Sequence, residues 1–307
     1  MTFYYTWTGF GDVVLDLIGV TTWIAMDPSL HVFFVLNNNR KPADRVYDMS
    51  LFKFEDKKIN LMESHMGGLK PNSGIKTIKG APGCSIHPWN IAEITGASIA
   101  RTCQEFKKNA HRIRPSQLIL NTIPFVLEQE YTIGIHLRKS DKITEQDPHH
   151  GTSLEEFNCI IFMLKEYVSE EIKAGHSKFF VCSEDSAWRR EIEGWIEDQG
   201  GSAVMVATND ALSSKRGWGP ILDFFCLTKC KKIIQGIGYS TFSMAASMVG
   251  GGIPLVNLHT KAVETPEYYL NWWAPLLNLQ MADEEDCQRY REMRENAGRD
   301  VARLRVE

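Results

Sequence analysis

Residues 131–142, YTIGIHLRKSDK, decide the fold class that this 307-residue chain is expected to adopt. The first seven positions are mostly apolar, aromatic or β-branched and predict a buried β-strand, and four charged residues follow from Arg138 onward. Open sheets of parallel strands bind their ligands at the carboxyl ends of the strands. The segment therefore predicts an α/β fold with a charged binding site just beyond Leu137. The alternative that the pattern leaves open is an ordinary solvated loop.

Strands and helices alternate along the chain after this segment. The pattern predicts four more strands, at Lys178–Cys182, Ala203–Val206, Lys232–Gln235 and Ile253–Leu258. The helices predicted between them are Leu154–Val168, a segment from Asp185 to Gly200, Pro220–Thr228 and Thr241–Met248. Five strands joined by helices are typical of a doubly wound sheet.

The amino-terminal half begins with the same kind of unit. Phe3–Thr6 predicts a strand, Gly9-Phe10-Gly11 a turn, Asp12–Ala25 a helix and His31–Leu36 a second strand. A strand–helix–strand unit predicts parallel pairing of its two strands. The turn is not a dinucleotide-binding fingerprint, because Val14 stands where the third glycine would be.

The segments between these two halves have weaker patterns. Residues 37–83 are charged and rich in Gly and Pro, which predicts loops and short elements. Ile91–Ile113 predicts a helix, and Arg114-Pro115 the start of another. We therefore divide the chain near Glu128 into two α/β halves. The tail 283–307 alternates acidic and basic residues and predicts a solvated helix.

The composition excludes several classes of function. The chain has 34 basic and 38 acidic residues, a balance that argues against nucleic acid or an anionic membrane as its main partner. The seven cysteines form no CxxC pair, which indicates reduced thiols and no structural metal. The most apolar stretch, Val13–Met26, contains Asp16 and is shorter than a membrane span, so no transmembrane segment is expected.

Two further segments could bind a ligand. Asp223 is the single carboxylate of the apolar run 219–225 and is expected in the first turn of its helix. Burying it requires hydrogen-bond donors, and a guanine edge offers two adjacent ones; stabilisation by the helix dipole is the alternative. In the segment 236–243, glycines and hydroxyls lead into a helix whose N–H groups suit phosphate oxygens. A plain N-cap at Ser240 or Thr241 is compatible with that role.

In these segments the chain resembles the fucosyltransferases of the core α1,6, nodulation and protein-O-fucosyl superfamily. Residues 136–142 look like their His-x-Arg-Arg-x-Asp-Lys motif, with Lys139 in place of the second arginine. Glu184-Asp185 is similar to the second motif, and Asp223 with the turn at 240–243 looks like the third. The three motifs occur in the family's order over about residues 113–250.

The resemblance implies a GT-B-like fold, with two Rossmann-like domains that face each other. Residues 1–128 would form the acceptor-side domain, 129–258 the domain that binds the nucleotide sugar, and 259–307 a helical segment that crosses back. The implied reaction is an inverting transfer of fucose from GDP-fucose to a glycan hydroxyl, with no metal or other cofactor. The partners would be the nucleotide-sugar donor and the glycan acceptor, without nucleic acid.

The resemblance also assigns roles residue by residue. Arg138 and Lys142 would stabilise the departing pyrophosphate, and Glu145 would be the general base, with Asp12, Asp147 and Asp185 as other candidates. The implied nucleotide-binding residues are His136, Arg138, Asp141, Asp185, Asp223, Ser240, Thr241 and Phe242, with Gly9 and Gly11 at the facing turn.

Two alternatives remain beside this expectation. The first is the same fold with another donor, such as GDP-mannose, GDP-rhamnose or UDP-xylose. The second is a glycan-binding homologue without catalytic activity, for which Lys139 is the one hint. The cysteine pattern places the protein in a reducing, cytoplasmic compartment and favours a bacterial or viral enzyme.

Overall fold

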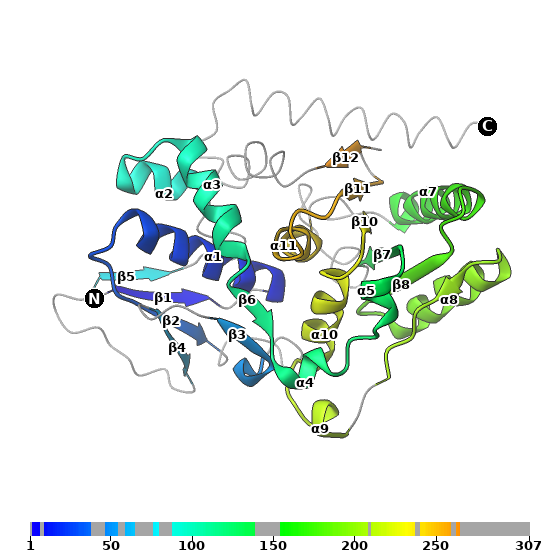
Figure 1. Cartoon of the computed structure of the whole chain (residues 1–307), viewed down its shortest axis with the longest axis horizontal. Helices are drawn as coiled ribbons and strands as arrows, with labels where there is room; N and C mark the ends of the chain where they lie inside the picture. The colour runs from blue at the N-terminus through cyan, green and yellow to red at the C-terminus, as the bar shows by residue number, and fades with distance from the viewer. Residues whose placement is uncertain are drawn as a thin grey trace.

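The computed structural model describes residues 2–6, 9–37, 47–54, 59–64, 76–79, 88–138, 154–207, 210–236, 240–258 and 262–264. Two sheets lie on either side of a group of central helices (Figure 1). The expected helix of the tail and most of the segment 259–307 lie outside the described residues, so its path stays a prediction.

The larger sheet has six strands in the order β12-β11-β10-β7-β8-β9. Its five strands from β7 to β11 pair in parallel, and β12 is antiparallel to β11. The α/β class and the order of the five expected strands are confirmed, whereas the strand expected at Ala203–Val206 is Ser202–Ala203 and β12 was not expected. The bounds of the strands are β7 Thr132–Leu137, β8 Lys178–Ser183, β9 Ser202–Ala203, β10 Lys232–Gln235, β11 Leu255–Asn257 and β12 Ala262–Glu264.

Helices connect these strands and cover the sheet. They are α7 Leu154–Lys173, α8 Ser186–Asp198, α9 Asp210–Ser213, α10 Trp218–Leu227 and α11 Thr241–Val249. Asp185 begins α8 by accepting hydrogen bonds from the backbone N–H groups of Ala187 and Trp188, and this satisfies two donors of the first turn. All of β7 is buried, as its apolar sequence requires.

The smaller sheet has four parallel strands in the order β4-β2-β1-β5. Its strands are β1 Thr2–Thr6, β2 Val32–Asn37, β4 Ile59–Ser64 and β5 Lys76–Lys79. The expected strand–helix–strand unit of β1, α1 Phe10–Met26 and β2 is confirmed. The described elements of 37–83 are short, as expected, and one of them, β4, pairs with β2 along six residues.

The expected helix Ile91–Ile113 is wrong in its extent. The segment forms α2 Pro88–Thr95 and α3 Ile99–Ala110, separated by Gly96 at a φ of +67° and by Ser98, whose side chain caps α3. Ile113 belongs instead to β6 Ile113–Pro115, which pairs antiparallel with β3 Phe52–Phe54. The helix expected from Arg114-Pro115 starts later, at Gln117, because these two residues belong to β6 and Ser116 caps the helix. The short helices η3 Met49–Leu51, α4 Gln117–Leu120 and α5 Val126–Gln129 complete this region.

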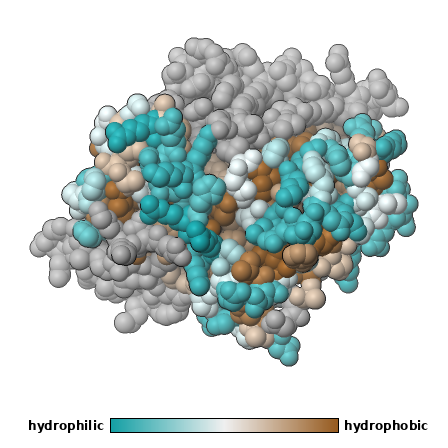
Figure 2. Space-filling view, in the orientation of Figure 1, coloured by the Kyte–Doolittle hydropathy of each residue, from teal (hydrophilic) through white to brown (hydrophobic). Residues whose placement is uncertain are grey.

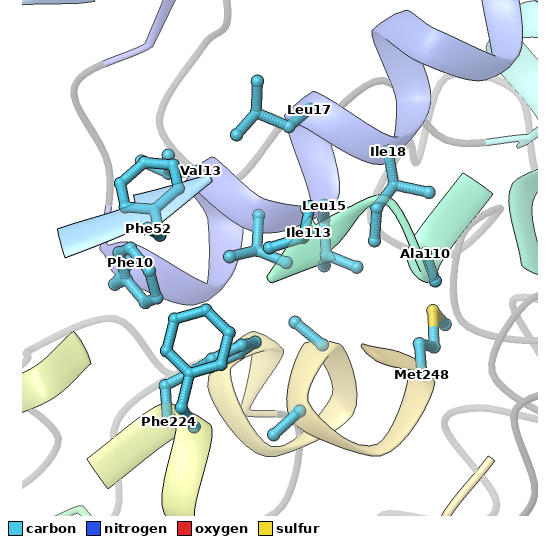
Figure 3. Packing of buried hydrophobic residues seen from close by; sticks show 14 of the residues in the cluster. Phe10, Val13, Leu15, Leu17, Ile18, Phe52, Ala110, Ile113, Phe224 and Met248 are labelled. Carbon is cyan, nitrogen blue, oxygen red and sulfur yellow. The ribbon is translucent and has the colours of Figure 1, made fainter. Parts of the chain in front are cut away.

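Helix α1 follows β1 of the small sheet and contacts helices of both halves of the chain. Its residues are nearly all buried, and it packs against α3 on one side and α11 on the other (Figure 1). One hydrophobic cluster runs from α1 into α10 and α11, so the two sheets share a core. Figure 3 shows Phe10 of α1 facing Phe224 of α10, and their ring centroids are 5.1 Å apart.

The outward face of α3 is hydrophilic, in contrast to the face that contacts α1. Cys103, Phe106 and Ala110 are buried, whereas Arg101 and Lys108 are exposed, and Figure 2 shows a continuous hydrophilic surface over this helix. Among the helices of the described residues, none is both long and apolar enough to cross a membrane.

Candidate functional site

The amino-terminal ends of α1 and α11 meet without an intervening side chain. Gly11 lies in the first turn of α1, and a Cβ atom placed on it would come within 2.5 Å of the Phe242 backbone nitrogen and Cα. Only glycine permits this approach. The glycine turn was expected to face a ligand, and the structure brings Gly11 against the start of α11.

His136 lies beside this junction, as the last residue but one of β7. It is 6% exposed, and its ring stacks on the Phe242 ring at a centroid distance of 4.9 Å. Its Nδ1 atom lies 3.2 Å from the Ser243 hydroxyl. Burial, and then the charge of Arg138, lower the pKa of His136 to about 3. The imidazole is therefore neutral at physiological pH.

Arg138 is the first residue after β7 and is partly buried. It is close enough to His136 for its charge to act on the imidazole. The structure thus brings together the cation after β7, the neutral histidine within β7 and the start of α11. These are the positions that the sequence assigned to one site.

Ser240 precedes α11 and has an unusual environment. The residue is 4% exposed, and its hydroxyl has no hydrogen-bond partner among the described residues. It occupies the N-cap position, but its side chain caps no N–H group of α11. The expected capping hydrogen bond from the helix to the Ser240 hydroxyl is therefore wrong, although the residue is at the N-cap position. Thr241 and Phe242, the next two residues, are partly exposed.

Asp223 is placed differently from the expectation. Helix α10 begins at Trp218, after Gly217 at a φ of +66°, so Asp223 lies in the second turn rather than the first. Stabilisation by the helix N-terminus is thus not its role. Burial raises the pKa of Asp223 to about 6, although Arg189 opposes this by Coulombic attraction and a hydrogen bond. The Asp223 side chain is 17% exposed.

Arg189 is the residue of this region that the sequence analysis missed. Its Nη1 donates to Asp223 Oδ1 at 3.4 Å, and its Nε donates to Glu193 Oε1 at 2.9 Å. Arginine four residues before glutamate is a recognisable pairing within a helix, so Glu193 was a detectable partner. No local pattern connects Arg189 with Asp223, which lies 34 residues further along the chain.

Some of the remaining candidate residues, such as Asp185 and Gly9, are described by the structure, and others are not. Asp185 is used in the cap of α8, which gives this carboxylate a structural role. Gly9 is the extended N-cap residue of α1. The predictions for Lys139, Asp141, Lys142, Glu145 and Asp147 lie outside the described residues. A cavity of about 260 Å³ lies at the carboxyl-terminal ends of α10 and α11, beside Arg114 and Lys229, and none of the described candidate residues lines it.

The architecture matches that of GT-B-like fucosyltransferases. No model of a known protein family matches the chain, and no curated protein does. Among solved structures, NodZ α-1,6-fucosyltransferase soaked with GDP-fucose has a TM-score of 0.50 at 14% identity, covering 86% of this chain and 98% of that one. This likeness confirms the α/β fold with its sheet of five parallel strands, and the expected arrangement of two facing domains stays a prediction.

Two other solved fucosyltransferases show a weaker likeness. Arabidopsis thaliana FUT1, as a variant in complex with GDP, has a TM-score of 0.48 at 10% identity, covering 83% of this chain and 69% of that one. POFUT1 in complex with GDP-fucose has a TM-score of 0.45 at 12% identity, covering 81% of this chain and 93% of that one.

Proposed function

We propose that the protein is an inverting glycosyltransferase that transfers fucose from GDP-fucose to a hydroxyl of a glycan. The observation that carries this proposal is the junction of α1 and α11, where the Ser240 hydroxyl lies next to the start of a helix and has no hydrogen-bond partner among the described residues. A buried hydroxyl without a partner is costly, and a phosphate oxygen would supply the missing acceptor.

The pyrophosphate of the donor is the group that needs most stabilisation. During transfer the bond between the sugar and the diphosphate breaks, and negative charge develops on the leaving oxygen. The N–H groups of Thr241 and Phe242 stand at a helix N-terminus and Arg138 adds a positive charge, so together they would stabilise that charge without a metal ion. Lys142 would add a second cation. Asp141 would hold one of the cations in position.

His136 contributes as a neutral group. Because its pKa is lowered to about 3, it does not repel Arg138 and does not attract the phosphate by charge. Its role is to line the nucleotide pocket and to fix Phe242 and Ser243 by stacking and by the contact at Nδ1. Gly11 is required because it lets the α1 turn approach Phe242.

The other two requirements are base recognition and a general base. Asp223 would accept the N1–H and 2-amino donors of guanine, which favours a GDP-sugar over a UDP-sugar, because uracil offers a single imide donor. Glu145 would take the proton of the acceptor hydroxyl. Asp185 is a weaker candidate for that role, since its carboxylate already accepts two backbone hydrogen bonds.

The direct test replaces Arg138. Replacing one preorganised group that stabilises developing charge costs about 10²–10³ in rate, so Arg138→Ala should lower fucose transfer from GDP-fucose by at least that factor. Arg138→Lys should retain part of the activity, because it keeps the charge but loses the planar fork. Arg101→Ala, an exposed position on α3, is the matched control and should keep full activity.

Circular dichroism and thermal unfolding of each variant would show whether the fold is intact. Wild-type activity in a folded Arg138→Ala variant would contradict the proposal. Absence of both transfer and GDP-fucose hydrolysis in the wild type, on an array of glycan acceptors, would favour the inactive glycan-binding homologue.

A further inference from the structure

Arg189 is held in place from three sides. Its Nε donates to Glu193 Oε1 at 2.9 Å within α8, and its Nη1 donates to Asp223 Oδ1 at 3.4 Å on α10. Its guanidinium lies 5.5 Å from the centroid of the Phe180 ring in β8. The side chain is 22% exposed, so water screens these contacts only in part. Arg189 therefore has one preferred orientation, and it links α8 to α10.

The surroundings of Asp223 explain why this link matters. Asp223 faces Arg189 and Glu193 from α8, the Cys182 thiol from β8, and Cys226 on its own helix. Arg189 is the single cation of this set, and it faces the carboxylates of Asp223 itself and of Glu193. Burial raises the pKa of Asp223 to about 6 even with Arg189 present. Removing the cation would raise that pKa further and leave the carboxyl protonated at neutral pH.

Protonation of Asp223 would change what it can bind. An ionised carboxylate accepts hydrogen bonds at both oxygens, as the two adjacent donors of a guanine edge require. A protonated carboxyl keeps a donor of its own and cannot accept both.

We propose that Arg189 is a positioning residue for nucleotide recognition, which keeps the Asp223 carboxylate ionised and oriented so that it can accept both donors of a guanine base. This inference rests on the proposed function, since it takes the ligand to be a guanine nucleotide. Arg189 acts through Asp223, and the base is read by the carboxylate.

The test measures the affinity of the full chain for GDP and for inosine diphosphate, which lacks the 2-amino group, between pH 6 and pH 9 by isothermal titration calorimetry. If the pKa of Asp223 in Arg189→Met lies one unit above the assay pH, about a tenth of the molecules carry the ionised carboxylate, and GDP affinity falls about tenfold. The loss should shrink as the pH rises. The preference for GDP over inosine diphosphate should be lost at neutral pH and return at high pH.

Two variants make the result specific. Arg189→Lys keeps the charge and should retain most of the GDP affinity. Arg190→Met removes the neighbouring exposed arginine, which donates to the Ser186 carbonyl, and should match the wild type at every pH.

A purely structural role predicts a different outcome. Arg189→Met would then unfold at a lower temperature but keep the wild-type GDP affinity, base preference and pH profile, and this result would overturn the inference alone. Failure of the wild type itself to bind GDP would overturn the proposed function together with the inference. The two failures are distinguished by the protein in which the loss is seen.

Discussion

Gly11 of α1 lies directly against the backbone of Phe242 at the start of α11, although 231 positions separate them in the sequence. This contact joins the helix that follows β1 of the small sheet to the helix that follows β10 of the large sheet. It places the α1 turn next to His136, because Phe242 also stacks on that imidazole. The site therefore depends on an approach that any side chain at position 11 would block.

Gly11→Ala should accordingly weaken both the fold and the site. The added methyl group would have to push backbone atoms apart, because its nearest neighbours are the Phe242 nitrogen and Cα. We expect a loss of about 1–3 kcal/mol in the free energy of unfolding, as for other overpacked positions. GDP affinity should fall in parallel, as measured by calorimetry.

Gly194→Ala is the matched control for this change. Gly194 lies inside α8, and a Cβ there would meet no atom within 4 Å. Alanine should therefore stabilise the helix by about 0.5–1 kcal/mol and leave GDP binding unchanged. Wild-type stability and GDP affinity in Gly11→Ala would contradict the importance of the close approach.

Ser240→Ala should change stability and binding in opposite directions. The Ser240 hydroxyl is buried without a partner among the described residues, so its removal should leave the free energy of unfolding unchanged or raise it by about 1 kcal/mol. GDP affinity should fall, because the hydroxyl would lose its contact with the phosphate. Chemical denaturation and calorimetry on the same protein measure both effects.

Ser98 provides the comparison for Ser240. Its side chain accepts a hydrogen bond from the Arg101 N–H at the start of α3, so Ser98→Ala should cost about 1 kcal/mol and leave GDP affinity unchanged. If Ser240→Ala destabilises the protein as Ser98→Ala does and binds GDP normally, the hydroxyl has a capping role and no ligand role.

His136 should make the protein sensitive to acid. Its pKa is lowered from 6.5 to about 3 in the folded state, so the unfolded chain takes up its proton first as the pH falls. The stability that depends on a neutral His136 is complete above pH 6.5. It is lost as the pH falls toward 3, by at most about 1.4 kcal/mol of unfolding free energy per pH unit. His136→Gln removes this dependence.

The measurement is urea denaturation of the wild type and of His136→Gln between pH 4 and pH 7. Groups common to both proteins cancel in the difference, including Asp223, whose raised pKa acts in the opposite direction. The wild type should lose stability relative to the variant as the pH falls. A difference that stays constant over this range would show that His136 titrates normally in the folded protein.

The sequence located the parts of the site that follow from local patterns. The apolar run before Arg138 predicts β7, and the hydroxyls that precede α11 predict a helix start, because each pattern lies within about ten residues. His136 and Ser240 could therefore be assigned to one edge of a sheet before their contacts were known. Parallel strands bring their carboxyl ends together whatever the intervening sequence.

The contacts between distant segments could not be predicted in this way. Gly11 was placed in a turn, but nothing near it indicates Phe242 as its neighbour. Pro220 suggested the first turn of α10, since proline favours that position, yet Gly217 starts the helix earlier and moves Asp223 to the second turn. Strand β4 was missed because charged residues flank it and its partner, β2, precedes it by over twenty residues.

A hydrogen-bond network between the amino-terminal end of β10 and helix α7 should be important for stability alone. Lys232 Nζ donates to Glu171 Oε1 at 2.5 Å and to Tyr167 Oη at 3.2 Å. Although burial would raise it, the pKa of Glu171 is lowered by hydrogen bonds from Lys232 and His176. Lys232→Met should cost about 2–3 kcal/mol, because it leaves a largely buried carboxylate without its cation.

Lys231→Met, at the exposed neighbouring position, is the control and should be close to neutral. The double change Lys232→Met with Glu171→Leu should recover much of the lost stability, since no unpaired charge remains. GDP affinity should be unchanged in all three variants. A loss of binding in Lys232→Met that exceeds its loss of stability would place this network within the functional site.

The choice of nucleotide tests the central claim most directly. Thermal unfolding of the full wild-type chain should be measured with GDP and with UDP, each over a wide range of concentration. We predict that GDP raises the unfolding temperature, with about 2.7 kcal/mol of added stability at a hundred times its dissociation constant, and that UDP has no effect. Equal stabilisation by UDP, or none by GDP, would contradict the assignment of a GDP-fucose-dependent transferase.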